Sequence, residues 1–183
     1  MKQSIETEVA VIGAGPGGYT AAFRAADLGK NVTIIEMEKA LGGVCLNHGC
    51  IPSKALLHIS KVIHEADSVK YCGVNFQPPQ IDLDKLRGYK EKVVSQLNRG
   101  IVNMVKARKI NVLHGIAKFD SKNRLSIQTK DDEVKLSFQN AIISTGSSPK
   151  PIHGFPMDHP NLLTSTEALQ LHKIPESLLI VGG

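Results

Sequence analysis

The feature that most constrains the fold is a glycine-rich turn, Gly13-Ala-Gly-Pro-Gly-Gly18. Residues 7–12, before it, predict a buried parallel strand, and the Ala-rich residues 17–28 after it predict a helix that ends at Gly29. Residues 31–36 predict a second strand. A strand, a helix and a strand in this order form a right-handed βαβ unit whose two strands are parallel neighbours.

The turn has the G-x-G-x-x-G spacing of a dinucleotide site, at Gly13, Gly15 and Gly18. The first glycine allows the tight turn, the second lets a pyrophosphate approach the backbone, and the third lets helix and strand pack closely. The helix N-terminus then offers free N–H groups and a favourable dipole to phosphates. Glu36 ends the second strand, where a carboxylate can bind both ribose hydroxyls and repel a 2′-phosphate. FAD or NAD therefore fits this site better than NADP.

Further along the chain, helices and strands alternate with linkers. Helices are predicted over 52–66 and 82–107, strands over 110–114 and 140–144, and a hairpin over 124–137 with its turn near Lys130-Asp131-Asp132. The long helix carries an apolar stripe that is typical of core or of a subunit contact: Leu83, Leu86, Tyr89, Val93, Leu97, Ile101 and Met104.

The C-terminal part of the sequence predicts a linker followed by a new strand. Prolines at 149, 151, 156 and 160 mark the linker, and residues 178–181 predict a buried strand that leads into Gly182-Gly183. We therefore expect a first domain over residues 1–150, a linker over 151–177, and the first strand of a second nucleotide-binding domain over 178–183. On this interpretation the sequence is a fragment of a longer chain.

Two cysteines, Cys45 and Cys50, lie five positions apart. On a regular helix their Cα atoms would be roughly 8.6 Å apart, which exceeds the limit of about 7 Å for a disulfide. A bridge thus requires a distorted turn, which Gly49 permits, and Pro52 suits the first turn of a following helix. A helix N-terminus stabilises a thiolate and favours disulfide exchange.

Three other interpretations of the pair remain: a zinc site, a structural disulfide, or two unrelated buried thiols. No second Cys or His pair has matching ligand spacing, so no metal is expected, and a reducing cytosol disfavours structural disulfides. A redox-active disulfide is the favoured interpretation. Cys72 has no partner in the sequence and is interpreted as a small buried apolar residue.

A redox disulfide also helps to choose the cofactor. A disulfide takes up two electrons but accepts hydride poorly, whereas a flavin accepts hydride and can then reduce sulfur. FAD is therefore the expected occupant of the first nucleotide site, and NAD that of the second.

The net charge of +5 and the isoelectric point of about 9.1 reflect basic residues between Lys85 and Lys109. No aromatic residues are interleaved for base stacking, so we interpret this cluster as the solvated face of a helix and expect no nucleic-acid partner. The apolar run Val9–Ala14 is too short for a signal peptide, and no stretch is long enough to span a bilayer. A cytoplasmic location is expected.

The segment Gly42-Gly-Val-Cys-Leu-Asn-His-Gly-Cys-Ile-Pro-Ser-Lys54 resembles the active-site signature of the pyridine nucleotide-disulfide oxidoreductases. Its Ile-Pro-Ser-Lys ending is similar to that of the dihydrolipoamide dehydrogenases. Glutathione and trypanothione reductases usually carry Lys in place of Ser53, and mercuric reductases usually carry Val in place of Ile51. The resemblance covers the chain from Gly13 to Gly183. It implies an α/β fold: a Rossmann-like FAD/NAD(P)-binding domain of three layers (ββα), with a parallel central sheet, a long helical excursion and a small β-meander.

The resemblance also implies roles for individual residues. Cys45 would be the interchange thiol that meets a dithiol substrate, Cys50 would lie as a thiolate against the flavin, and Lys54 would stabilise negative charge on the flavin ring. The other implied FAD contacts are Glu36, Met37, Glu38, Gly42, Gly43, Val44, Cys45 itself, Gly115, Ala117, Ser144, Thr145 and Gly146. Gly182 and Gly183 would open the NAD motif.

The implied reaction is oxidation of protein-bound dihydrolipoyl groups, with NAD as final acceptor. The implied partners are lipoyl domains of 2-oxo acid dehydrogenase complexes and a second copy of the full-length chain. The acid–base pair of the family lies in a C-terminal interface domain, so this chain alone is not expected to turn over. The alternatives are an isolated FAD-binding module and another family member such as a mercuric reductase. His48 departs from the usual apolar residue and is interpreted as an exposed loop histidine.

Overall fold

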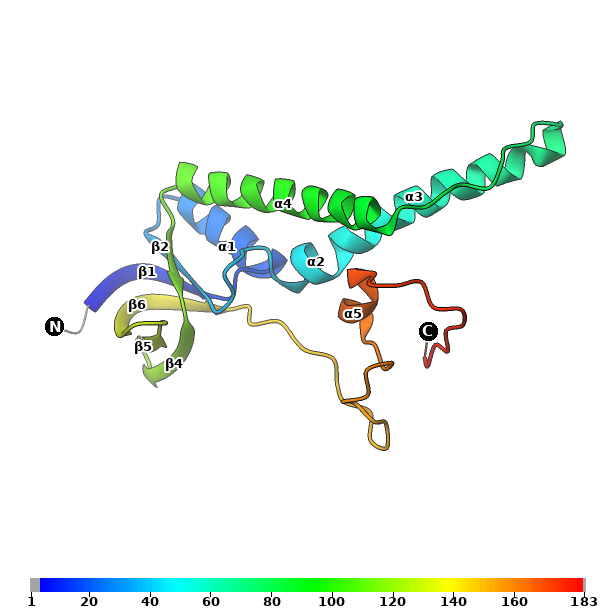
Figure 1. Ribbon diagram of the computed structural model, residues 1–183. Helices are drawn as coiled ribbons and strands as arrows, with labels where there is room; N and C mark the ends of the chain where they lie inside the picture. The colour runs from blue at the N-terminus through cyan, green and yellow to red at the C-terminus, as the bar shows by residue number, and fades with distance from the viewer. Residues whose placement is uncertain (1–3, 183) are drawn as a thin grey trace.

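Six strands form one sheet in the computed structural model, which describes residues 4–182 (Figure 1). The strands are β1 (Ser4–Ile12), β2 (Val32–Glu36), β3 (Asn111–His114), β4 (Ile116–Ser121), β5 (Arg124–Gln128) and β6 (Glu133–Ile143). Their order is β3-β2-β1-β6-β5-β4. The first four in this order are parallel neighbours, and β6-β5-β4 is an antiparallel meander. The expected α/β fold with a parallel sheet and a small meander is confirmed.

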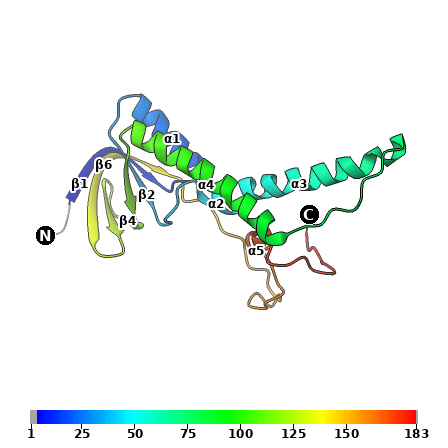
Figure 2. The same ribbon diagram turned by 45° about the horizontal axis from the view of Figure 1, so that its top comes forward.

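The helices lie mainly on one side of the parallel strands. They are α1 (Pro16–Asp27), α2 (Gly43–His48), α3 (Cys50–Ser68), the 3₁₀-helix η1 (Val69–Cys72), α4 (Leu83–Ala107) and α5 (Ser165–Gln170). Figures 1 and 2 both show α4 lying along α1, while the far half of α3 extends away from the body of the protein.

Alternation along the central strands produces two cores. Successive side chains of a strand point to opposite faces, so Val9 and Val11 of β1 pack beneath α1 and α4, whereas Ala10 packs against the meander. In β2, Ile34 likewise packs on the helix side and Ile35 on the meander side. The three layers are therefore helices, parallel strands and meander, as expected from the resemblance.

Strand β6 differs from its prediction. The sequence indicated a hairpin arm up to 137 and a separate strand over 140–144, but the structure has one continuous strand, Glu133–Ile143. Its first half pairs with both β5 and β1, and its second half continues along β1 to Ile12. The continuity follows from the long parallel register with β1, a non-local pairing that the local pattern does not reveal.

The prediction that the apolar stripe of α4 faces the core is largely wrong. Of its residues only Ile101 is buried, and Tyr89, Leu97 and Met104 are exposed. The buried residues of the helix are Lys90, Ile101 and Val105. The helix is rotated relative to the prediction because its contacts with α1, α2 and α3 select the face. The alternative role of the stripe, a subunit contact, stays a prediction.

The basic residues of α4 are not simply a solvated face. Lys90 is only 8% exposed and donates to the carbonyl oxygen of Leu169 at 3.0 Å. Arg87 donates to the carbonyl oxygens of Leu171 and His172. Two cations thus bind the carbonyl end of α5, where the helix dipole favours positive charge. Arg108, directly after α4, forms an ion pair with Asp27 of α1, and this pair links α4 to α1.

The predicted strand over 178–181 is not formed. Residues 178–182 have no regular secondary structure, and their apolar side chains are exposed, with Leu179 at 87%. A strand is stabilised by pairing, and no strand of the described residues 4–182 pairs with this segment. The predicted domain boundaries remain predictions, and Gly183 lies outside the described residues.

Cys72 is exposed, contrary to the prediction of a buried residue. It ends η1, which continues from the far end of α3. Figure 1 shows this end of α3 well away from the sheet, where no core is available to bury a thiol.

Candidate functional site

The turn between β1 and α1 packs so closely that side chains are excluded. We call residues 13–18 the glycine cradle. A Cβ on Gly18 would lie 1.8 Å from the carbonyl oxygen of Gly13, and a Cβ on Gly13 would lie 2.2 Å from that of Ser144. Gly13 also has φ of +98°, in the left-handed region that favours glycine. The predicted glycine roles at the turn and at the helix–strand contact therefore have a direct steric basis.

Gly15 faces a second glycine rather than a side chain. A Cβ on Gly43, the first residue of α2, would lie 2.7 Å from the Cα of Gly15. The backbone N–H of Gly42 donates to the carbonyl oxygen of Ala14 at 2.8 Å. The loop after β2 is thus fastened across the cradle, and it brings the start of α2 to the same place.

The N-terminus of α1 opens onto the cradle. Gly15 is its N-cap and Pro16 its first residue, and no side chain among residues 4–182 caps this end or places a carboxylate in its first turn. The free N–H groups and the dipole of a helix N-terminus bind phosphates. A pyrophosphate therefore fits the cradle, which is bare backbone at the point where a side chain would block it.

Glu36 is held in place by the backbone around it. Its side chain is buried, with 7% exposed, and its two carboxylate oxygens accept the N–H groups of Ala14 at 2.7 Å and Glu38 at 2.9 Å. A carboxylate has about four acceptor positions, so it can still accept ribose hydroxyls. This arrangement fits the adenosine half of a dinucleotide beside the cradle.

Other predicted contacts lie at the same ends of the strands. Ser144 follows β6, and its N–H donates to the carbonyl oxygen of Ile12, while the N–H of Gly115 donates to that of Glu36. A Cβ on Gly115 would lie 2.5 Å from the carbonyl oxygen of Gln128. Ala117 is half-buried on β4 next to this bend, and Thr145 and Gly146 are exposed beside Ser144. The carboxyl ends of β1, β2 and β6 therefore meet at the cradle, as the fold class requires.

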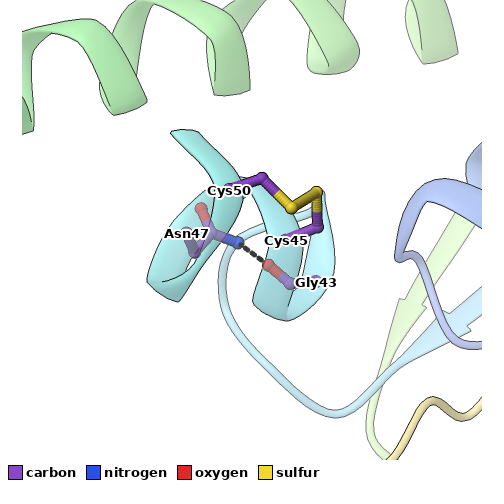
Figure 3. Close-up of a disulfide and its surroundings, with 4 residues drawn as sticks. All are labelled: Gly43, Cys45, Asn47 and Cys50. Carbon is purple, nitrogen blue, oxygen red and sulfur yellow. Dashed lines mark hydrogen bonds between the residues drawn. A yellow bond between two sulfur atoms is a disulfide. The ribbon is translucent and has the colours of Figure 1, made fainter. Parts of the chain in front are cut away.

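Cys45 and Cys50 form a disulfide (Figure 3). Cys45 lies in α2, Cys50 is the first residue of α3, and their Cα atoms are 4.8 Å apart. A regular helix would separate them by roughly 8.6 Å. At Gly49 the backbone leaves the helical conformation, with φ of −135° and ψ of −98°. This break brings the two Cα atoms closer together than a continuous helix would. We call residues 43–50 the disulfide segment.

The helix that begins at Cys50 is 19 residues long. Within residues 4–182 no side chain caps its N-terminus, so its dipole is available to stabilise a thiolate on Cys50. Lys54 is exposed four residues later, on the same side of the helix. Val44, Met37 and Glu38 are also exposed in the loop and the disulfide segment that follow β2.

His48 is exposed, as predicted, but it ends α2 instead of lying in a loop. Its side chain lines a cavity of about 440 Å³ bounded by α2, α3, α4 and α5. The cysteines are not among the residues that line this cavity.

One predicted residue, Gly182, does not join the site. Gly182 lies in the exposed segment after α5, and a Cβ placed on it would have no heavy atom of the described residues within 4 Å beyond its own chain neighbours. Figures 1 and 2 show this segment away from the carboxyl ends of the strands. Gly183 lies outside the described residues. Their assignment to an NAD motif stays a prediction.

Sequence reasoning missed three residues that shape the site. Asn47 and Asn98 both donate to the carbonyl oxygen of Leu41, in the loop before α2. The ring Nδ1 of His114 lies 2.8 Å from the carbonyl oxygen of Glu38, which ties β3 to the loop after β2. Asn47 lies between the two cysteines in the sequence, so the motif alone could have suggested a structural role for it. No local pattern signals Asn98 or His114.

Residues 4–182 hold neither a cluster of metal ligands nor a membrane-spanning helix. No three His, Cys, Asp or Glu residues are grouped as metal ligands. No helix of this described part is long and apolar enough to cross a membrane.

Comparison with known proteins places this geometry in context. The chain is 48% identical to the dihydrolipoyl dehydrogenases of Vibrio cholerae and Haemophilus influenzae, over its whole length, and 45% identical over 98% of its length to the mitochondrial dihydrolipoyl dehydrogenase of Pisum sativum. It spans 38%, 38% and 36% of these relatives. The family model described as pyridine nucleotide-disulphide oxidoreductase matches residues 7–183. With its dinucleotide cradle beside a disulfide, this chain belongs to the pyridine nucleotide-disulphide oxidoreductase family.

Proposed function

We propose that this chain is the flavin-binding part of an enzyme that oxidises protein-bound dihydrolipoyl groups, with FAD as resident cofactor and NAD as final acceptor. The observation that carries the proposal is the contact between Gly43 and Gly15, which sets the start of the disulfide segment against the dinucleotide cradle. The names of the relatives support the choice of substrate. Because the chain spans about 38% of those relatives, the activity belongs to the proposal for the whole protein.

FAD, when bound, supplies the link between thiol–disulfide exchange and hydride transfer to NAD. Its pyrophosphate would lie on the glycine cradle and the N-terminus of α1, and its adenosine ribose would lie against Glu36. Met37, Glu38, Val44, Lys54, Ala117, Thr145 and Gly146 are further proposed contacts, and Gly182 and Gly183 are proposed for the NAD motif.

The two cysteines would divide the exchange reaction between them. A substrate thiolate attacks Sγ of Cys45, the Cys45–Cys50 bond breaks, and its electron pair leaves on Cys50. The second substrate thiolate then attacks the first substrate sulfur, which closes the lipoyl disulfide and releases Cys45 as a thiolate. Two electrons pass from the dithiol to the cysteine pair, and the two substrate protons pass to solvent or to the new thiolates.

The structure supports Cys50 as the leaving group. Exchange is faster when the departing thiolate is the more stable one, and Cys50 is the first residue of the 19-residue α3, whereas Cys45 lies within the six-residue α2. Exposure alone would not select Cys45 for attack, because Cys45 is half-buried and Cys50 is exposed. The assignment of roles therefore rests on thiolate stability at the helix end.

The partners we propose are lipoyl domains of 2-oxo acid dehydrogenase complexes and, in the full-length protein, a second copy of the chain. A cytoplasmic location belongs to the same proposal, because a reducing compartment suits a disulfide that is opened and closed in turnover.

The test is an anaerobic titration of the protein, expressed from its complete gene, with dihydrolipoamide while the visible spectrum is recorded. We expect a flavin spectrum that gains long-wavelength absorbance on addition of the dithiol, and no such gain in Cys50→Ser. NADH formation from NAD and dihydrolipoamide would separate this enzyme from other members of the family, such as mercuric reductases. A flavin spectrum that dithiol leaves unchanged would indicate an FAD-binding module, and a protein that binds no FAD would contradict the proposal entirely.

A further inference from the structure

One backbone carbonyl, that of Leu41, is shared by two asparagine side chains from different helices. Nδ2 of Asn47 in α2 lies 3.0 Å from it, and Nδ2 of Asn98 in α4 also donates to it. Asn47 donates in addition to the carbonyl oxygen of Gly43 at 3.1 Å (Figure 3). A carbonyl oxygen has two lone pairs, so both of those of Leu41 are used. We call Leu41, Asn47 and Asn98 the asparagine clamp.

The clamp fastens a helix that is weak on its own. The helix α2 has six residues and no N-cap side chain within the described chain, and helices this short are marginal in water. Its covalent link to α3 is the Cys45–Cys50 bond in addition to the backbone at Gly49. When that bond is reduced, the orientation of α2 depends on its non-covalent contacts.

We propose that Asn98 is a positioning residue: through the carbonyl of Leu41 that it shares with Asn47, it holds α2 on α4 while the disulfide is open. The inference rests on the proposed function, because it concerns a cysteine pair that cycles between disulfide and dithiol. In the dithiol form the clamp keeps Cys45 and Cys50 within bonding reach. Closure then requires little further ordering of the chain, since an ordered pair reacts as if at high effective concentration.

The clamp should therefore shift a measurable equilibrium. Without Asn98 the dithiol form gains conformational freedom that closure must remove, so the balance moves toward the dithiol. One net hydrogen bond corresponds to a change of about five-fold in this equilibrium constant. A residue that only supports the fold would stabilise both redox forms alike and would leave the equilibrium unchanged.

The experiment uses protein expressed from its complete gene and equilibrated in mixtures of reduced and oxidised dithiothreitol, with the Cys45–Cys50 state read by thiol trapping and mass spectrometry. The exchange is balanced, since one dithiothreitol dithiol becomes a disulfide as the cysteine pair becomes a dithiol. The variants are Asn98→Ala and Asn98→Leu, the second of which keeps the bulk of the side chain. The matched control is Asn123→Ala, which removes side-chain donors to the carbonyl oxygens of Phe138 and Gln139 on the meander.

We expect both Asn98 variants to favour the dithiol by about five-fold relative to the parent protein, and Asn123→Ala to match the parent. Hydrogen exchange over residues 43–49 should be faster in the Asn98 variants only when the pair is reduced. Faster exchange in both redox forms, or an unchanged equilibrium, would overturn the inference while the proposed function stands. A parent disulfide that dithiothreitol does not open would overturn both.

Discussion

The glycine cradle and the disulfide segment touch each other but are held by different means. The cradle is fixed by backbone against backbone, with distances that exclude a Cβ at Gly13, Gly18 and Gly43. The disulfide segment is held by side chains that reach carbonyl groups and by one bond between cysteines. Under the proposed function the cradle only binds and can be fixed permanently, whereas the cysteine pair opens and closes and needs a support that survives the loss of its own bond.

The largest expected effect comes from crowding the cradle. Gly18→Ala places a Cβ 1.8 Å from a backbone oxygen, so helix and strand must separate. We expect the free energy of unfolding to fall by about 3 kcal/mol, as measured by denaturant titration. The matched control is Gly17→Ala, whose Cβ would be 3.8 Å from Oγ of Ser144; it should be neutral or stabilising by up to about 1 kcal/mol, because alanine favours a helix. Equal losses in the two variants would contradict the steric account.

Removing the charge of Glu36 should be next in size. In Glu36→Gln an amide NH₂ group replaces one carboxylate oxygen and faces the backbone N–H of Ala14 or of Glu38. Both of these groups are donors, so one hydrogen bond is lost. A buried donor left unsatisfied costs about 2 kcal/mol. Denaturant titration measures this loss, and FAD titration should show weaker binding as well. Glu38→Gln, whose exposed side chain lies two residues away, should leave the free energy of unfolding unchanged.

Removal of the disulfide should cost somewhat less than crowding the cradle. The bond closes a loop with a sequence separation of five residues, for which chain entropy predicts a stabilisation of about 2 kcal/mol. The double variant Cys45→Ser/Cys50→Ser should unfold at correspondingly lower denaturant and still form the cradle, as judged by FAD binding. Cys72→Ser is the control, because Cys72 is exposed and outside the segment. Loss of FAD binding in the double variant would mean that the two regions are not independently supported.

The smallest effect is expected at the opposite end of the β1–β2 pair. The hydrogen bond from Lys30, followed by that from the N–H of Asn31, lowers the pKa of Glu8 below its ordinary value of 4.5. A lowered folded-state pKa stabilises the protein above pH 4.5, and this contribution is lost as the pH falls through the folded-state value. Glu8→Gln should therefore flatten the decrease in stability below pH 4.5, as measured by denaturant titration at several pH values. Glu6→Gln, an exposed carboxylate on the same strand, is the control, and an equal flattening there would contradict the assignment.

Local patterns were sufficient for the first βαβ unit. The close packing expected at Gly13 and Gly18 is present, and Glu36 ends β2 as the sequence indicated. The roles of Gly15 and Glu36 toward a cofactor stay predictions. The cysteine spacing also required a break in the helix, and the break lies at Gly49 as the sequence indicated. These inferences succeeded because each depends on residues close together in the chain.

The long helix α4 shows where such reasoning ends. Its apolar stripe indicated one buried face, yet the structure buries Lys90 and exposes Leu97 and Met104. Lys90 is buried because Leu169, seventy-nine positions away in sequence, offers it a carbonyl oxygen at 3.0 Å. Residues 178–181 form no strand among the described residues for the same reason, because an apolar run becomes a strand only beside a pairing partner. Their place in a second domain stays a prediction.

By itself the sequence determined the glycine turn, the acid at the end of β2 and the need for a broken helix between Cys45 and Cys50, since each follows from residues close together in the chain. Only the tertiary structure decided that β6 runs unbroken from the meander into the parallel sheet, and that Asn98 meets Asn47 on one carbonyl. Those contacts join segments far apart in the chain. They are selected by how whole elements pack, which no short window of sequence contains.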